Sequence, residues 1–176
     1  MGGSTVMTHK NMNIIKTIII GLTITAIQAV AEAPISFANL SSNETVQIIY
    51  TSTGCFHGHA YEFIVSGGSA PTIKAYSLTP NYFFEGDPPP KRSKDLGIIP
   101  LEVSDLTRLD ALFEFYRTPK DDERCTTEEF ITATLIRDGV HIAVESYKDS
   151  SCELPNDCLK LWDIHWQFTQ KVEQIK

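Results

Sequence analysis

Hydrophobic residues in the first half of the chain gather in short runs, separated by small and polar residues. The runs TVQIIYTST at 45–53, HAYEFIVS at 59–66 and TIKAYSL at 72–78 are rich in β-branched and aromatic residues, which favours strands. Gly67-Gly68 ends the second run, and the connections between the runs are short. We therefore expect three antiparallel strands in a meander.

The segment Ser104–Arg117 has a different period, because its hydrophobic residues recur at helical spacing. On a helix they would share one face: Leu106, Leu109, Leu112, Phe113 and Tyr116. Ser104 is a suitable N-cap, Asp105 favours the positive end of the helix dipole, and Thr118-Pro119 ends the helix. A single amphipathic helix of this kind is expected to pack across a sheet.

Residues 126–147 have the pattern of a hairpin, with Asp138-Gly139 as its two-residue turn. If this turn sets the register, the numbers of opposed residues sum to 277, and Leu135 faces Ile142. The same register puts Val144 on the face of Leu135, which is mostly apolar. We expect this apolar face to pack on the core.

The last segment, residues 156–176, fits two patterns. As a strand, it would alternate polar residues with Trp162, Ile164, Trp166 and Phe168. As a helix, it would place on one face Leu161, Ile164, Phe168, Val172 and Ile175, which is the longer pattern. We expect a helix, in which Trp162 and Trp166 either pack on the sheet or form an interaction surface.

Residues 79–100 contain three consecutive prolines, which cannot donate to a sheet ladder, so we expect a long loop. It holds the most basic patch of the chain, made by Lys91, Arg92 and Lys94. Long loops in compact domains are often functional, and these three residues are our candidates for binding a protein partner. The alternative is a solvated loop without a binding role.

Together these elements predict one small α+β domain at 45–176, mostly an antiparallel sheet of about five strands. One amphipathic helix packs on the sheet, and a C-terminal helix follows. Residues 32–44 are small and polar, and we expect a loose lead-in. Two glycosylation sequons, at Asn39 and Asn43, fall within it and would be bare in a bacterial protein.

The first 31 residues have the features of a signal peptide. An apolar run, Thr17–Ala31, follows a basic stretch and is too short to span a bilayer. It ends in the small-x-small pattern Ala29-Val30-Ala31, so we expect cleavage after Ala31, with Ala33 as the second choice. A start at Met12 would give a more compact signal peptide, and the alternative to cleavage is a retained anchor.

The whole chain carries a formal net charge of −7, and cleavage removes Lys10 and Lys16 but no acidic residue. The mature chain would then have a net charge of −9. Nucleic acids and anionic membranes attract clustered positive charge, so neither is expected as a partner. We expect a secreted or periplasmic protein without stable membrane insertion after cleavage.

Four cysteines in an exported chain predict two disulfides. The hairpin register opposes Cys125 and Cys152, whose numbers also sum to 277, and this leaves Cys55 to pair with Cys158. The rival arrangement joins Cys152 to Cys158 and Cys55 to Cys125.

The stretch GCFHGHAYEF at 54–63 places His57 and His59 on the same side of a strand. Two such histidines could hold zinc or copper if His141 or His165 joined them, because a stable site needs three or four ligands. No spacing in the sequence brings the four together. The alternative is a hydrogen-bonded pair at the start of a strand.

Catalytic motifs of hydrolases are scarce, since the chain contains neither Gly-x-Ser-x-Gly nor His-Glu-x-x-His. Cys55 is a poor candidate nucleophile, because disulfide pairing would leave it no free thiol. We therefore expect a non-enzymatic binding or accessory module without a cofactor, comparable to an inhibitor or an immunity protein. The alternatives are a metal-binding protein that uses His57 and His59, and a small hydrolase with a dispersed site.

Overall fold

The structure is a computed structural model that describes residues 33–54, 57–79, 90–118 and 126–151, and a few residues beyond them. The latter are Lys160, Leu161, Ile164, Gln167 and Phe168. All described residues belong to one compact unit, Glu32–Lys176. They form an antiparallel sheet with one packed helix, which confirms the predicted α+β class.

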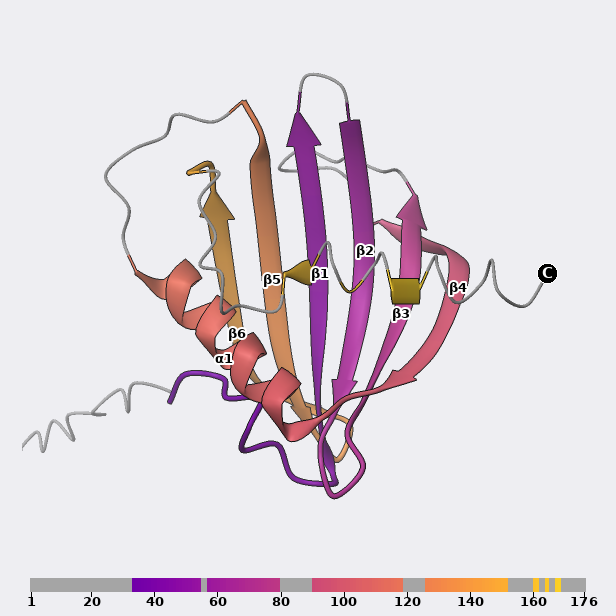
Figure 1. The fold of residues 1–176 in the computed structure, drawn as a ribbon, viewed down its shortest axis with the longest axis vertical. Coiled ribbons are helices and arrows are strands. Elements are labelled where there is room, and N and C mark those ends of the chain that lie inside the picture. The colour runs from indigo at the N-terminus through magenta and orange to yellow at the C-terminus, as the bar shows by residue number, and fades with distance from the viewer. Residues whose placement is uncertain are drawn as a thin grey trace, which may run out of the picture. The chain divides into compact units, whose positions relative to one another are not determined.

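The described sheet has six strands, one more than the sequence predicted. The elements are β1 (Glu44–Gly54), β2 (His57–Ser66), β3 (Thr72–Thr79), β4 (Lys91–Pro100), α1 (Val103–Arg117), β5 (Glu128–Arg137) and β6 (Val140–Asp149). Their order in the sheet is β4-β3-β2-β1-β5-β6, and all neighbours are antiparallel (Figure 1). The meander of the first three strands is confirmed. Strand β5 pairs with the other side of β1, so β1 lies inside the sheet.

Strand β4 is the additional strand, so the prediction of a loop throughout 79–100 was wrong for its second half. β4 pairs with β3 along an irregular ladder that has two register shifts. Gly97 adopts a φ of 105°, a conformation that favours glycine. Only Leu96 and Ile99 are buried in this strand, so its sequence lacks the alternation that indicates a half-buried strand.

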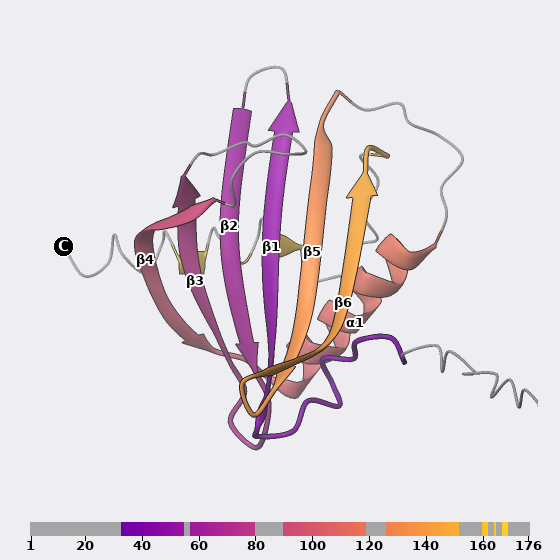
Figure 2. The ribbon, with the colours of Figure 1, turned by 180° about the vertical axis from the view of Figure 1, so that it is seen from behind.

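Helix α1 buries the predicted apolar face against the sheet, namely Leu106, Leu109, Leu112, Phe113 and Tyr116. Its N-cap is Glu102 rather than Ser104, and the Glu102 N–H donates to the Asp105 carboxylate at 3.0 Å. We call the side of the sheet under α1 the covered face, and the other side, seen in front of α1 in Figure 2, the open face.

The β5–β6 hairpin has the predicted turn, with φ of 50° at Asp138 and 79° at Gly139. The predicted register was wrong beyond it, because a bulge at Leu135/Ile136 pairs Leu135 with Ala143. A slip of one residue exchanges the two faces of a strand. Val144 is therefore 58% exposed on the open face, whereas Ala143 is buried.

The lead-in, residues 33–43, is not loose as predicted, because it contributes to the core. Ile35 and Phe37 are buried, and the Phe37 ring lies 4.9 Å from that of Phe113 between centroids. Leu40 packs so closely on Gly67 that a Cβ added to this glycine would lie 2.5 Å from the Leu40 backbone. The lead-in therefore closes the edge of the core beside α1.

Polar side chains fix the backbone of the lead-in. The Asp110 carboxylate accepts the N–H groups of Phe37 at 2.6 Å and Ala38 at 3.1 Å. Glu145 accepts the Ile35 N–H at 2.7 Å, and Arg117 donates to the Ile35 carbonyl oxygen at 2.7 Å. Within the described residues no strand pairs with these two N–H groups, so the Asp110 side chain serves as their acceptor instead.

The described residues near the C-terminus support the helical alternative. Leu161, Ile164, Gln167 and Phe168 have helical backbone conformation, and the three apolar ones are buried in the core. The Ile164 N–H donates to the Lys160 carbonyl oxygen at 3.2 Å, which is the spacing of an α-helix. Trp162 and Trp166 lie outside the described residues.

Several sequence predictions fall outside the described part of the chain. They concern the signal peptide at 1–31 and the disulfides of Cys55, Cys125, Cys152 and Cys158. The bulge in the hairpin ends the register that opposed Cys125 to Cys152, so the register no longer favours that pairing. Within the described residues, no helix is long and apolar enough to cross a membrane.

Candidate functional site

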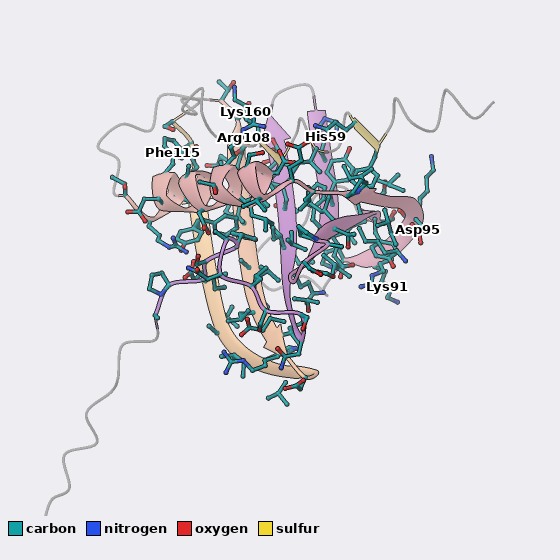
Figure 3. All side chains as sticks on the ribbon, turned by 60° about the horizontal axis from the view of Figure 1, so that its bottom comes forward. His59, Lys91, Asp95, Arg108, Phe115 and Lys160 are labelled. Atoms are coloured by element: carbon teal, nitrogen blue, oxygen red, sulfur yellow. The ribbon has the colours of Figure 1, made fainter. Side chains whose placement is uncertain are left out.

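The three basic residues predicted to bind a partner lie on β4, the outermost strand beyond β3. All three are exposed, and Figure 3 shows Lys91 and Asp95 along this strand, away from Phe115 on α1. The structure separates their positions. Arg92 contacts side chains of β2 and β3, whereas Lys91 and Lys94 oppose Thr79 and Ser77 of β3, on the other face of the sheet from Arg92.

Arg92 forms a two-point ion pair with Glu62 of β2. Its Nη2 lies 2.6 Å from Glu62 Oε1, and its Nε donates to Glu62 Oε2. Gln47 of β1 also donates to Glu62 Oε1 at 2.6 Å. Glu62 is only 3% exposed, so the carboxylate is buried and charge-paired.

Tyr76 of β3 lies between two cations on the open face. Its ring centroid is 4.1 Å from the Arg92 guanidinium carbon and 4.8 Å from Lys74 Nζ. Lys74 Nζ also lies 3.1 Å from Asp95 Oδ2. We call the set Gln47, Glu62, Lys74, Tyr76, Arg92 and Asp95 the Arg92 cluster; it links strands β1 to β4.

The electrostatics of the Arg92 cluster favour its charged form. Burial alone would raise the pKa of Glu62, but hydrogen bonds from Arg92 and Gln47 outweigh burial and hold the pKa below its ordinary value. The hydrogen bonds that Arg92 donates to Glu62 also raise the pKa of Arg92. Both partners are therefore charged, and Arg92 is ion-paired with Glu62.

The rest of the open face exposes apolar side chains on the β5–β6 hairpin. Phe130 is 40% exposed and Val144 is 58% exposed. Lys148 Nζ lies 2.9 Å from Glu128 Oε1 and 5.8 Å from the Phe130 ring centroid. The open face therefore mixes aromatic, aliphatic and paired charged side chains.

On the covered face, two tyrosines bind one carboxylate. The hydroxyls of Tyr50 on β1 and Tyr116 on α1 donate to Glu129 of β5 at 2.7 and 2.9 Å. Burial, and then the Glu129 charge, raise the pKa of both tyrosines, so both remain neutral donors at physiological pH. Because each carboxylate oxygen of Glu129 has a donor, this network fastens α1 to the sheet.

The predicted metal ligands are not brought together. His59 lies on β2 (Figure 3). It stacks on Tyr61 with ring centroids 6.2 Å apart. His141 lies beside the hairpin turn and pairs with Ile136 of β5, which pairs in turn with Thr45 of β1. His59 pairs with Ser52, which lies far along β1 from Thr45, so the two histidines are well separated on the sheet.

The remaining candidates, the side chain of His57 and all of His165, lie outside the described residues. Across the described ranges, no group of three or more histidines, cysteines, aspartates and glutamates could hold a metal ion. Zinc or copper binding, and a hydrolase with a dispersed site, stay predictions.

Sequence reasoning found Arg92 but missed Glu62 and Tyr76. These two residues oppose each other on β2 and β3, and Asp95 of β4 opposes Tyr76. Glu62 lies between Tyr61 and Phe63, which are both buried. Because successive side chains of a strand point to opposite faces, this alternation could have predicted that Glu62 lies on the open face. Its pairing with Arg92 needed β4, which the sequence did not predict.

The Arg92 cluster and the adjacent edge of β4 form the candidate binding surface. It combines an aromatic ring, an ordered guanidinium and two exposed lysines, Lys91 and Lys94, within neighbouring strands. No protein-family model, curated protein or solved structure matches the chain.

Proposed function

We propose that this chain is a non-enzymatic binding protein, an inhibitor-like or accessory module, that recognises a partner protein through the Arg92 cluster. The observation that carries the proposal is the ordering of Arg92 between Glu62 and Tyr76 on an exposed strand. Arginine and tyrosine are the residue types that most often dominate binding energy in interfaces. A side chain that is already ordered loses less entropy on binding, which favours affinity.

The charges around the Arg92 cluster favour an acidic partner segment. Lys91 and Lys94 are exposed next to Arg92, while the chain as a whole carries a net charge of −7. A local basic edge in an acidic protein steers an acidic segment to that edge and repels it elsewhere. The proposed partner is therefore a protein with an acidic surface or loop.

The proposal includes export. The mature protein would begin at Glu32 after cleavage behind Ala31, would carry two disulfides, and would act in the periplasm or outside the cell. Intact-mass measurement of protein from its own compartment tests this. A mass that begins at Glu32 and is lower by about four hydrogens supports it, and a full-length reduced chain contradicts it.

Site-specific photo-crosslinking tests the binding surface. A photoreactive residue replaces Thr79, which opposes Lys91 at the basic edge, or Thr107, an exposed threonine on α1 that serves as the matched control. We expect a discrete adduct with an acidic protein from position 79 only. The double charge reversal Lys91→Glu/Lys94→Glu should lower its yield about tenfold or more.

A second control separates local from overall charge. Arg108→Glu on α1 also adds negative charge, but away from β4, and should leave the adduct yield unchanged. Equal yields with and without the double reversal at β4 would remove the Arg92 cluster as the recognition surface. An adduct with a basic protein would contradict the proposed partner chemistry.

A further inference from the structure

Arg92 uses only part of its hydrogen-bonding capacity. A guanidinium has five N–H donors, one on Nε and two on each Nη. Glu62 accepts one hydrogen from Nε and one from Nη2. No acceptor among the described residues bonds to the hydrogens that remain, one on Nη2 and two on Nη1, and the side chain is 49% exposed. We call the edge formed by Nη1 and Nη2 the outer edge of Arg92.

The contacts of Arg92 set the direction of its outer edge. Arg92 starts from β4 and bonds to Glu62 of β2, and its guanidinium carbon lies 4.1 Å from the Tyr76 ring centroid on β3. The guanidinium therefore crosses β3 on the open face of the sheet. Two hydrogen bonds to one buried carboxylate fix the plane of the guanidinium, so its outer edge is held in a defined orientation.

We infer that the outer edge of Arg92 binds a carboxylate side chain of the partner, end-on and through two hydrogen bonds. This inference rests on the proposed function and names the group that the acidic partner contributes. The outer edge carries donors only, so a lysine or an apolar side chain of the partner would find no acceptor there. Two parallel N–H groups match the two oxygens of a carboxylate, which is the geometry of a bidentate ion pair.

The surrounding charges favour an anion over a neutral carbonyl group. Four cations and two carboxylates give a local formal charge of +2, counting Lys74, Lys91, Arg92 and Lys94 against Glu62 and Asp95. Lys91 and Lys94 lie on the other face of the sheet, so they attract the anion over a distance and salt screens their effect. Arg92 therefore recognises the carboxylate by contact, and the two lysines steer it.

The shared chemistry of the ligand is an oxyanion with two acceptor oxygens. The phosphate of a modified side chain also fits an arginine fork. A carboxylate is the oxyanion that an unmodified acidic protein surface supplies, so it is the group we assign. Competition between the two kinds of anion must be part of the test.

An NMR titration of the full chain with isotope-labelled arginine side chains tests the inference. The probe is acetyl-tetraglutamate amide at constant ionic strength, and acetyl-tetraglutamine amide is the neutral control. We expect the acidic peptide to shift the Nε and Nη signals of Arg92 with a dissociation constant of about 1–10 mM. The neutral peptide should leave these signals unchanged. Unmoved Arg92 signals with the acidic peptide would overturn the inference.

Two matched substitutions separate the arginine fork from its charge. Arg92→Lys keeps the charge but loses the fork, and should raise the dissociation constant about tenfold, read from backbone signals of β3 and β4. Arg108→Lys is the same replacement at an arginine that is 45% exposed on α1, and should change the constant less than about twofold. Equal effects of the two substitutions would overturn the inference. Circular dichroism checks that both variants are folded.

A phosphopeptide identifies the kind of oxyanion. A peptide with two phosphoserines carries nearly the same total charge as tetraglutamate, and we expect it to shift the Arg92 signals no more tightly. Tighter binding of the phosphopeptide would overturn the assignment of a carboxylate. Failure of the peptide to reach Arg92, with the crosslink from position 79 retained, would overturn the inference and leave the proposed function standing. An absent crosslink would contradict the proposed function on evidence independent of the peptide.

Discussion

The two faces of the sheet are stabilised by different interactions. On the covered face, Phe113 packs against Phe37, Tyr116 and Tyr147, with ring centroids 4.9, 6.2 and 6.1 Å apart. On the open face, Arg92 is 49% exposed at its side chain while it pairs with the buried Glu62. One face depends on close packing of buried aromatic side chains, the other on charge pairing at its boundary.

This difference predicts different responses to substitution. Removal of a side chain from the covered face leaves a cavity, which lowers stability at every pH. Removal of one charged side chain from the open face leaves its oppositely charged partner unpaired. The resulting loss of stability depends on how much water can reach that partner. The following predictions run from the largest expected effect to the smallest.

Phe113→Ala should lower the free energy of unfolding by about 3–5 kcal/mol, because the fully buried ring contacts both the lead-in and the sheet. Urea denaturation measures the loss. Phe115→Ala is the control, since Phe115 is only partly buried on the same helix and should lose less. Equal losses for the two variants would contradict the central position of Phe113.

Arg92→Ala should lower the free energy of unfolding by about 2 kcal/mol, because it leaves the Glu62 carboxylate buried without its cation. The double variant Arg92→Ala/Glu62→Gln removes the buried charge as well and should recover part of the loss. A double-mutant cycle in urea measures the coupling. Additive effects of the two substitutions would show that the pair contributes no coupling energy.

Asp110→Ala should lower stability by about 1–2 kcal/mol, because the backbone N–H groups of Phe37 and Ala38 lose their acceptor. The effect should be local, so hydrogen exchange should accelerate in residues 33–43 more than in β1. Uniform acceleration in both segments would mean that the lead-in and the sheet open together.

Glu44 should make stability depend on acid pH. The backbone N–H and hydroxyl of Ser41, and then Arg137, lower its pKa from 4.5 to about 2. A pKa that is lower in the folded state stabilises the protein fully above about pH 4.5, and this stabilisation is lost as the pH falls towards 2. The Arg137 side chain is 51% exposed, so water screens its charge and the effect should be the smallest of the four.

Glu44→Gln tests this dependence, since glutamine does not titrate. At pH 7 the variant should unfold at lower urea concentration than the parent, and the two should converge as the pH approaches 2. A constant difference between them over that range would show that the Glu44 charge adds nothing to stability.

Elements with strong local signals could be predicted from the sequence. The apolar face of α1, the runs of β1 to β3 and the Asp138-Gly139 turn each follow from residues close together in the chain. β4 was missed because an edge strand that exposes Lys91 to Asp95 has no hydrophobic alternation to reveal it. The bulge at Leu135/Ile136 was missed because nothing in the local sequence requires an extra residue there.

The candidate site was predictable only in part. Lys91, Arg92 and Lys94 were visible as a basic patch, but the partners of Arg92 come from strands that approach only in three dimensions. The Glu62 side chain is 30 residues away from Arg92 in the chain, and Tyr76 joins them through the β3–β4 ladder. Side-chain clusters that depend on register cannot be predicted when one of the strands is unknown.

The lead-in implies an order of events in folding. Residues 33–43 are synthesised before their partners, since Phe37 and Asp110 are 73 residues apart and Ile35 and Glu145 are 110 residues apart. Contacts between distant residues form slowly, because a long loop must close first. We therefore expect the segment that is made early to take its place late, after β6 exists. An N-terminal fusion that displaces Phe37 should thus disturb the final step of folding and leave the sheet to assemble before it.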